Sequence, residues 1–280
     1  MLPVLALLLA AFTWGSAFCF IKQILDSISP YYLLAFRFSL SALLLCLIFP
    51  GKLRNLRQNT LLHGIHLGVI LYFEFFFYTV GLQYTTASKS AFICAGYMMI
   101  MPLVYFCIVR KRPAPHEIAA SFLCMAGLTC ILCSDLGSLN IGDAISSLTA
   151  VCYAVHIVYT GIYAKTDDPV LLNILQIGTA ALLSDAVALV SGPLPGALPS
   201  GALSGILYLA VMCTIIPYLL SVYGQRYVKT STSGILLSFE SVFGAALSIL
   251  VLGDPFTPLF ALGTILVVGS AVLSEQGTAA

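Results

Sequence analysis

The chain has 280 residues, of which 60% are hydrophobic and only 8% are charged, and its formal net charge is +1. A soluble domain has roughly 25% charged residues, so this composition excludes a water-soluble protein. The mean hydropathy of +1.03 instead indicates an integral membrane protein. In such a protein the basic residues report topology, so we expect no nucleic-acid partner.

Ten apolar stretches are long enough to cross a hydrocarbon core about 30 Å thick, which takes about 20 helical residues. In chain order they are 2–24, 30–49, 61–81, 86–109, 115–134, 143–164, 170–190, 202–223, 231–252 and 257–274. Clusters of Pro, Gly, Asp, Asn and Ser separate them, as in "SGPLPGALPSG". The first stretch lacks a basic n-region, so it is interpreted as a retained helix. The sequence therefore predicts an all-α polytopic membrane protein with ten transmembrane helices.

The basic residues predict the orientation of these helices. They concentrate in the connections between spans 2 and 3, 4 and 5, 6 and 7, and 8 and 9: Lys52, Arg54, Arg57, Arg110, Lys111, Arg112, Lys165, Arg226 and Lys229. Ten spans place all four connections on one side, which the positive-inside rule assigns to the cytoplasm. We expect a multi-pass protein of the plasma (inner) membrane with both termini cytoplasmic.

The nine cysteines are scattered through the spans with no matching partner cluster, so we expect neither a metal nor a cofactor.

An internal repeat is visible in the sequence. A shift of 143 residues lays "GLQYTTASKSAF" over "GQRYVKTSTSGI", and a shift of 139 lays Pro30 over Pro169 and Trp14 over Tyr153. Two five-span units, residues 1–137 and 138–280, follow from this match. A unit with five spans must enter the membrane inverted the second time. Inverted repeats are typical of secondary transporters, which bind substrate near the midplane between the halves.

The segments "FTWGSAFCFIK", "SPYYLLAFRF", "GLQYTTASKSAFICAGYMMIMP" and "SGILLSFESVFGAALSILVLGDPFTPLFALGTILVVGSAVL" resemble the EamA family of the drug/metabolite transporter superfamily. The resemblance covers essentially the whole chain. It implies ten helices in two inverted five-helix repeats, and export of small metabolites such as amino acids or related compounds. The family usually has Glu-Pro where this chain has Glu240 and Ser241.

Candidate substrate-binding residues follow from depth, counted at 1.5 Å per helical residue. Several polar or aromatic side chains fall near the middle of their spans: Trp14, Tyr97, Tyr153, His156 and Glu240. Under the repeat shifts Trp14 matches Tyr153 and Tyr97 matches Glu240, so these positions are expected to meet near the pseudo-symmetry axis. Glu74 lies slightly to the outer side, and Tyr78 is one turn further on the same face. Tyr218 belongs to a polar stripe of span 8 with Thr214, Ser221 and Gln225, next to the helix-kinking Pro217.

Each candidate also has a structural interpretation. Glu240 and Glu74 are buried carboxylates, which are usually functional in membranes, but either could instead hold helices together. His156 could be a core histidine bonded to a hydroxyl, and the aromatic residues could serve helix packing. Arg37, near the outer end of span 2, is interpreted as a structural residue whose long side chain snorkels to the interface.

These features favour a secondary active transporter for a small-molecule substrate, working by alternating access. A buried carboxylate could bind a proton or a cationic substrate in turn, which would allow proton coupling. The alternative is a passive facilitator or channel, which would need only a polar lining. No H-E-x-x-H, G-x-S-x-G or P-loop motif is present, so we do not expect an enzyme. The sequence does not indicate an oligomeric state.

Overall fold

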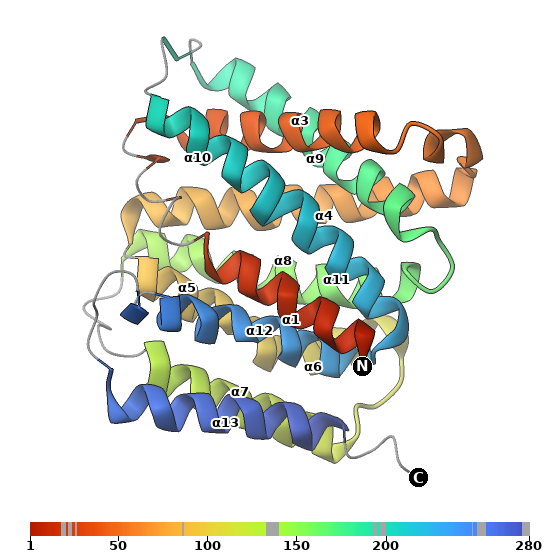
Figure 1. Cartoon of the computed structure of the whole chain (residues 1–280). Helices are drawn as coiled ribbons and strands as arrows, with labels where there is room; N and C mark the ends of the chain where they lie inside the picture. The colour runs from red at the N-terminus through yellow and green to blue at the C-terminus, as the bar shows by residue number, and fades with distance from the viewer. Residues whose placement is uncertain are drawn as a thin grey trace.

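The computed structural model describes residues 1–17, 21, 24–25, 27–85, 87–132, 140–192, 195–196, 200–247, 249–250 and 256–275. Of residues 55, 87–89, 132, 200 and 275 only the backbone is described. Within this part of the chain every regular element is a helix (Figure 1). The predicted boundary between residues 137 and 138 lies outside the described residues.

The helices follow the predicted spans in chain order. They are α1 (Leu2–Gly15), α3 (Pro30–Ile48), the short 3-10 helix η1 (Lys52–Asn55), α4 (Gln58–Tyr84), α5 (Ala87–Ala95), α6 (Tyr97–Val109), α7 (Pro115–Leu132), α8 (Ile141–Tyr163), α9 (Pro169–Ser191), α10 (Ser200–Ala210), the π-helix η3 (Val211–Ile215), α11 (Ile216–Tyr227), α12 (Thr230–Leu247) and α13 (Pro258–Glu275). Span 4 consists of α5 and α6, and span 8 of α10, η3 and α11. Six helical segments are long and apolar enough to cross a membrane, and α1, α7 and α13 are shorter apolar helices. The prediction of a ten-helix membrane fold is confirmed.

Local sequence signals explain where several helices begin. The Ser29 side chain accepts a hydrogen bond from the Tyr32 backbone N–H at the start of α3. Asn140 and Asp143 cap each other's backbone N–H groups at the start of α8, and Asp168 caps α9. These side chains satisfy N–H groups that have no partner within the helix.

Two spans are interrupted inside the bundle. Span 4 is interrupted at Gly96, which separates α5 from α6. Span 8 widens into the π-helix η3 just before Pro217, in agreement with the irregularity that the sequence predicts there. Irregular backbone inside a membrane protein occurs where it is buried in protein or lines a cavity.

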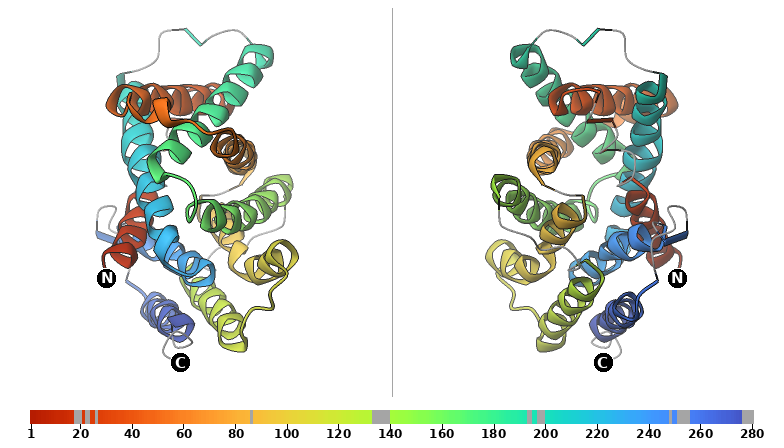
Figure 2. Two further views of the ribbon diagram at one scale, coloured as in Figure 1. Left: turned by 90° about the vertical axis from the view of Figure 1, so that its right-hand side faces the viewer. Right: turned by 90° about the vertical axis from the view of Figure 1, so that its left-hand side faces the viewer.

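Helix packing has the pattern of two similar halves. The contact of α1 with α12 joins spans 1 and 9, and its counterpart joins spans 4 and 6 through α5, α6 and α8. The contact of α4 with α8 likewise has a counterpart between α11 and α1. Spans 2 and 7 pack together as α3 and α9 on one side of the bundle, and spans 5 and 10 pack together as α7 and α13 on the opposite side (Figures 1 and 2). Exchanging the two halves therefore leaves most of the closely packed helix pairs unchanged.

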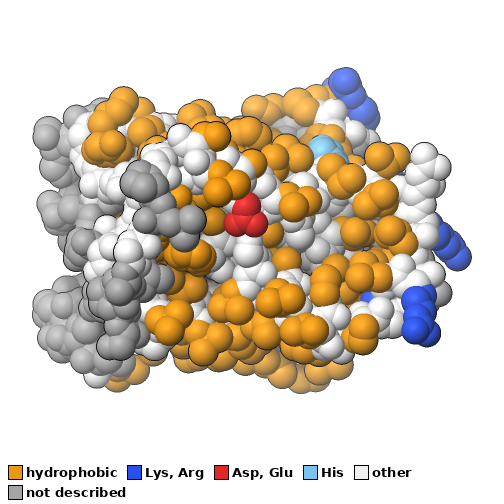
Figure 3. All heavy atoms as spheres, turned by 90° about the horizontal axis from the view of Figure 1, so that it is seen from above, with side chains coloured by type: hydrophobic (Ala, Val, Ile, Leu, Met, Phe, Trp, Pro, Cys, Tyr) orange, Lys and Arg blue, Asp and Glu red, His pale blue; other side chains and the backbone are white. Residues whose placement is uncertain are grey.

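One end of the bundle carries the basic connections. Figure 3 shows Lys and Arg side chains gathered at one end of an otherwise largely apolar face. The start of α1 and the end of α13 lie at the same end, as an even number of spans requires (Figure 1). We call this the basic end.

Candidate functional site

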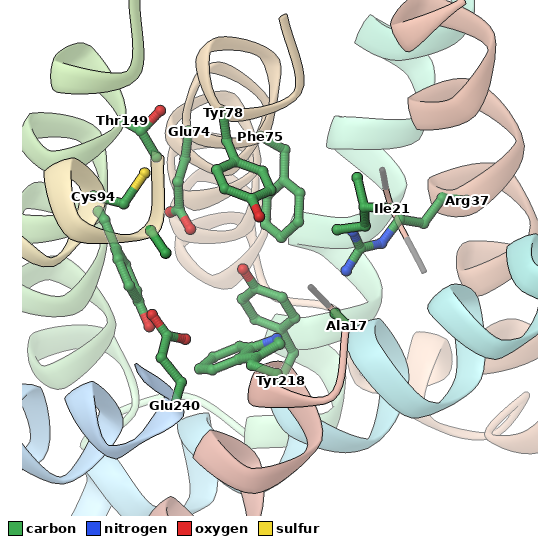
Figure 4. Close-up of a pocket in the computed structure, with 13 residues that line it drawn as sticks. Ala17, Ile21, Arg37, Glu74, Phe75, Tyr78, Cys94, Thr149, Tyr218 and Glu240 are labelled. Atoms are coloured by element: carbon green, nitrogen blue, oxygen red, sulfur yellow. The ribbon is translucent and has the colours of Figure 1, made fainter. Parts of the chain in front are cut away.

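A cavity of about 80 Å³ lies inside the bundle, between helices of both halves. Its wall includes six of the eight residues predicted from sequence: Trp14, Glu74, Tyr78, Tyr153, Tyr218 and Glu240. Figure 4 shows Glu74 and Glu240 at one side of this space and Arg37 at the other, with Tyr78 and Tyr218 between them. The fold therefore brings these six predicted residues to one cavity from five helices: α1, α4, α8, α11 and α12.

Tyr97 and His156, the other two candidates, are not among the lining residues. The Tyr97 hydroxyl donates a hydrogen bond to the Gly234 carbonyl oxygen at 2.9 Å, and its ring lies 4.4 Å from the Tyr153 ring. Tyr97 therefore supports the cavity wall from behind. His156 is buried beside Glu74, with Nε2 3.0 Å from Gln176 Oε1 and Nδ1 3.9 Å from Glu74 Oε2.

Glu74 is a buried carboxylate with an unsatisfied oxygen. Its residue is only 6% exposed, and Oε2 has no hydrogen-bond partner within the described structure. Leaving a charged group buried without a partner is costly, typically more than about 1–3 kcal/mol. Glu74 is therefore well suited to bind a cation or a proton that enters the cavity.

Glu240 approaches the same space from α12, which is held very close to α1. A Cβ atom built on Gly15 would lie 2.6 Å from the Glu240 carbonyl oxygen, a distance that side chains do not tolerate. Glycine at position 15 thus allows the two backbones to touch. This contact brings Trp14 and Glu240, from opposite halves of the sequence, to one cavity.

Arg37 is the charged lining residue that the sequence analysis did not predict. It does not snorkel to the interface: the residue is 3% exposed and lies in the cavity wall. Its Nε donates to Thr214 Oγ1 and its Nη2 to the Cys213 carbonyl, both at 2.7 Å, and its guanidinium carbon lies 4.5 Å from the centre of the Phe75 ring. Position 37 is seven residues into α3, about 10 Å from its start, so a depth count was a signal that could have found it.

The irregular part of span 8 explains how Arg37 and Trp14 are held. In a regular α-helix the Cys213 carbonyl would accept a bond from the backbone N–H of residue 217, but Pro217 has none. The carbonyl instead accepts bonds from Arg37 Nη2 and from Trp14 Nε1, the latter at 3.1 Å. The Trp14 ring packs edge-on against Tyr218, 5.1 Å between centroids. Pro217 therefore converts a helix carbonyl into an anchor for two cavity residues.

The cavity does not resemble a metal centre. No group of three His, Cys, Asp or Glu residues that could hold a metal ion occurs among the residues described. The arrangement is one of separated opposite charges in an aromatic surround, which suits an organic ion.

Comparison with known proteins places this architecture in a family. The sequence profile of the EamA-like transporter family matches residues 1–133 and 140–275. The chain belongs to the EamA-like transporter family. This EamA protein is accordingly a membrane transporter, surrounded by the lipid bilayer and acting on a small-molecule substrate.

Two further comparisons agree with this assignment. The chain is 27% identical, over 269 residues, to an uncharacterized transporter of Archaeoglobus fulgidus, covering 96% of this EamA chain and 84% of that protein. A crystal structure of another protein matches with a TM-score of 0.79 and 17% identity, covering 98% of this chain and 96% of that one. At that identity the structural match establishes a shared fold alone.

Proposed function

We propose that this transporter is a secondary active exporter of small zwitterionic metabolites such as amino acids. The observation that carries the proposal is the separation of charge across the cavity. Arg37 projects from α3, and Glu74 and Glu240 project from α4 and α12 on the other side (Figure 4). In the described structure the close contacts between a basic side chain and a carboxylate are Lys52–Asp168, His63–Asp167 and His156–Glu74, and the two histidine contacts are ionic only when the histidine is protonated. Arg37 is therefore paired with neither carboxylate of the cavity.

A zwitterion would supply both missing partners at once. Its carboxylate would bind the Arg37 guanidinium, which still has N–H donors beyond the two bonds that hold it. Its ammonium group would bind Glu74 or Glu240. The rings of Trp14 and Tyr218 would cover the remainder of the molecule and strengthen the binding of the cation. Such a ligand would offset the cost of burying these charges, which a purely apolar ligand would not.

The arrangement of the helices supports transport by alternating access. Most of the closely packed helix pairs have a counterpart when the halves are exchanged, and the cavity lies between helices of both halves. We assign the halves to residues 1–137 and 138–280, and we assign the basic end to the cytoplasm, in the plasma membrane. Rocking of one half against the other would open the cavity first to one side and then to the other.

Proton exchange would provide the driving force for export. A protonated Glu74 has no charge with which to hold an ammonium group, whereas an ionised Glu74 has. Proton and substrate would therefore compete for Glu74 and occupy it in turn. The unsatisfied Oε2 atom supports this role, because it is the atom to which either ligand would bind.

The test is counterflow in proteoliposomes that contain the purified protein. Vesicles loaded with unlabelled L-alanine, L-leucine or L-phenylalanine receive the same labelled amino acid outside, and uptake is followed over time. We expect saturable, transient accumulation of the label for at least one compound, because a carrier exchanges solute across the membrane. Uptake that never exceeds the external concentration, together with an electrical conductance, would identify a channel instead.

A further inference from the structure

A chain of amide hydrogen bonds along α9 determines the protonation of His156. Asn173 Nδ2 donates to the Pro169 carbonyl oxygen at 2.8 Å, and a carbonyl can only accept. Asn173 therefore turns Oδ1 toward Gln176, whose Nε2 donates to it at 2.7 Å. This leaves Gln176 Oε1 facing His156 Nε2 at 3.0 Å. Because Oε1 is an acceptor, Nε2 of His156 must carry the proton.

The consequence concerns the other nitrogen of the ring. In neutral His156 with a proton on Nε2, Nδ1 has a free lone pair. That atom is 3.9 Å from Glu74 Oε2, the oxygen that has no hydrogen-bond partner. A proton acceptor thus faces a carboxyl oxygen whose proton would have to leave when an ammonium group binds.

Few titratable or charged groups other than Glu74 face His156. From α4 it faces Glu74, from α9 the neutral Gln176, and from α11 the edge of the Tyr218 ring at 5.9 Å between centroids. His66, about two turns before Glu74 on α4, forms a hydrogen bond between its Nδ1 and the Tyr163 hydroxyl at 2.9 Å, and its ring packs against the Tyr159 ring. Arg37 and Glu240 line the cavity that Glu74 shares. Of these described neighbours, Glu74 is the one that approaches Nδ1.

We propose that Glu74 and His156 share one proton and that this pair couples transport to the proton gradient. When substrate displaces the proton, the O–H bond of Glu74 breaks and an N–H bond forms at His156 Nδ1. Carboxylic acid and imidazole become carboxylate and imidazolium, and total charge is unchanged. The ammonium group of the substrate then binds the carboxylate, and the imidazolium later releases the proton to water. His156 is a coupling residue outside the cavity wall, and Gln176 and Asn173 are its positioning residues.

This inference rests on the proposed function, and proteoliposomes separate the two. The probe is whichever of L-alanine, L-leucine and L-phenylalanine the parent protein carries best. Two rates are measured for each variant: exchange of labelled for unlabelled amino acid at equal pH, and accumulation driven by a pH gradient. A pH-sensitive dye inside the vesicles reports protons moved per amino acid.

For His156→Gln we expect exchange to continue while gradient-driven accumulation falls by at least about tenfold, as loss of a proton-transfer group does. Gln176→Leu keeps the imidazole but removes its anchor, and we expect a smaller loss of the same kind. It also serves as the second variant if His156→Gln does not fold. His116→Gln is the matched control, because His116 begins α7 away from the cavity and is expected to behave like the parent.

The result that would overturn the inference is equal proton movement per amino acid in the parent, His156→Gln and Gln176→Leu. Amino-acid exchange in the parent with no proton movement would overturn it as well, and would leave amino-acid transport standing while removing proton exchange as its driving force. Absence of exchange in the parent for all three amino acids would instead overturn the proposed function itself.

Discussion

Among the residues that the structure describes, two carboxylate–histidine pairs have different surroundings. At the basic end, Asp167 Oδ2 lies 2.7 Å from His63 Nδ1, and the same carboxylate accepts hydrogen bonds from Thr60 and Thr166. In the bundle, Glu74 Oε2 lies 3.9 Å from His156 Nδ1 and has no hydrogen-bond partner. The Asp167 carboxylate therefore has its hydrogen-bond partners, which we call a completed contact. One oxygen of the Glu74 carboxylate has none, which we call an open contact. A completed contact stabilises the fold, whereas an open one leaves its carboxylate available to a ligand.

Electrostatics at the basic end agree with this distinction. Burial alone would raise the pKa of Asp167, but hydrogen bonds from Thr60, His63 and Thr166 outweigh it and hold this pKa below the ordinary value of 3.8. Asp167 thus stays ionised at neutral pH and has its partners already. Next to it, Lys52 Nζ lies 2.6 Å from Asp168 Oδ2 and adds a second contact at the basic end.

Glu74→Gln should have the largest effect on transport. It removes the charge that would hold the ammonium group, and we expect amino-acid exchange to fall about 30-fold or more, equivalent to about 2 kcal/mol or more. The melting temperature should change little, since Oε2 has no hydrogen bond to lose. Counterflow and thermal unfolding of the same preparation measure both quantities. A variant with parental exchange would remove Glu74 from the binding site.

Arg37 offers the next largest effect and a test of charge at the opposite wall. Arg37→Gln should weaken the binding of amino acids about tenfold or more, because it removes the charged partner of their carboxylate group. Arg37→Lys keeps the charge but loses the two-pronged geometry, so an intermediate loss is expected. Competition against labelled amino acid gives the apparent affinities. If Arg37→Gln weakened the binding of matched amines, which lack a carboxylate, as much as the binding of amino acids, Arg37 would act only on the fold.

Gly15→Ala should affect stability more than recognition. The added methyl would meet the α12 backbone, so the helices must separate, at a cost of about 1–3 kcal/mol. Thermal unfolding in detergent measures the loss. Gly178→Ala is the matched control, since nothing lies within 4 Å of a Cβ built at that position of α9. A parental melting temperature for Gly15→Ala would mean that α1 and α12 do not touch as described.

Asp167→Asn should have the smallest effect, visible in the dependence of stability on pH. The folded-state pKa of Asp167 is lowered, so its contribution is present above about pH 3.8 and is lost as pH falls through the lower folded value. We expect the parent to lose stability as the pH falls from about 5 to below about 3.8, and the variant to lose less over the same range. Amino-acid affinity near neutral pH should remain parental. A large loss of affinity would contradict the purely structural role that completed hydrogen bonds assign to Asp167.

The sequence predicts the spans and much of the cavity because both depend on hydrophobicity and depth. Counting residues along a helix gives how deep a side chain lies but not which way it points. Of the residues predicted near the middle of their spans, Trp14 and Glu240 line the cavity, whereas Tyr97 packs against the Tyr153 ring and is not among the lining residues. The direction of a side chain around its helix is decided by packing against distant parts of the chain.

Arg37 illustrates the same limit from the other side. Snorkelling is the usual solution for an arginine near a helix end, and it requires no partner. Here the alternative depends on a carbonyl that Pro217 leaves free, 176 residues away from Arg37 at Cys213. The sequence shows that Pro217 can kink its helix, but it does not show that Arg37 binds the carbonyl that Pro217 leaves free. Asp185, at a similar depth, accepts hydrogen bonds from Ser39 rather than from Arg37.

The central claim is that the cavity binds a molecule with both a positive and a negative group. The most direct measurement is competition against counterflow of labelled L-alanine by three unlabelled compounds: L-alanine, ethylamine and propionate. The account predicts strong inhibition by L-alanine and inhibition by ethylamine and propionate that is weaker by about tenfold or more, because each lacks one charged partner. Equal inhibition by ethylamine and L-alanine would contradict it, since Arg37 would then make no contact with the substrate.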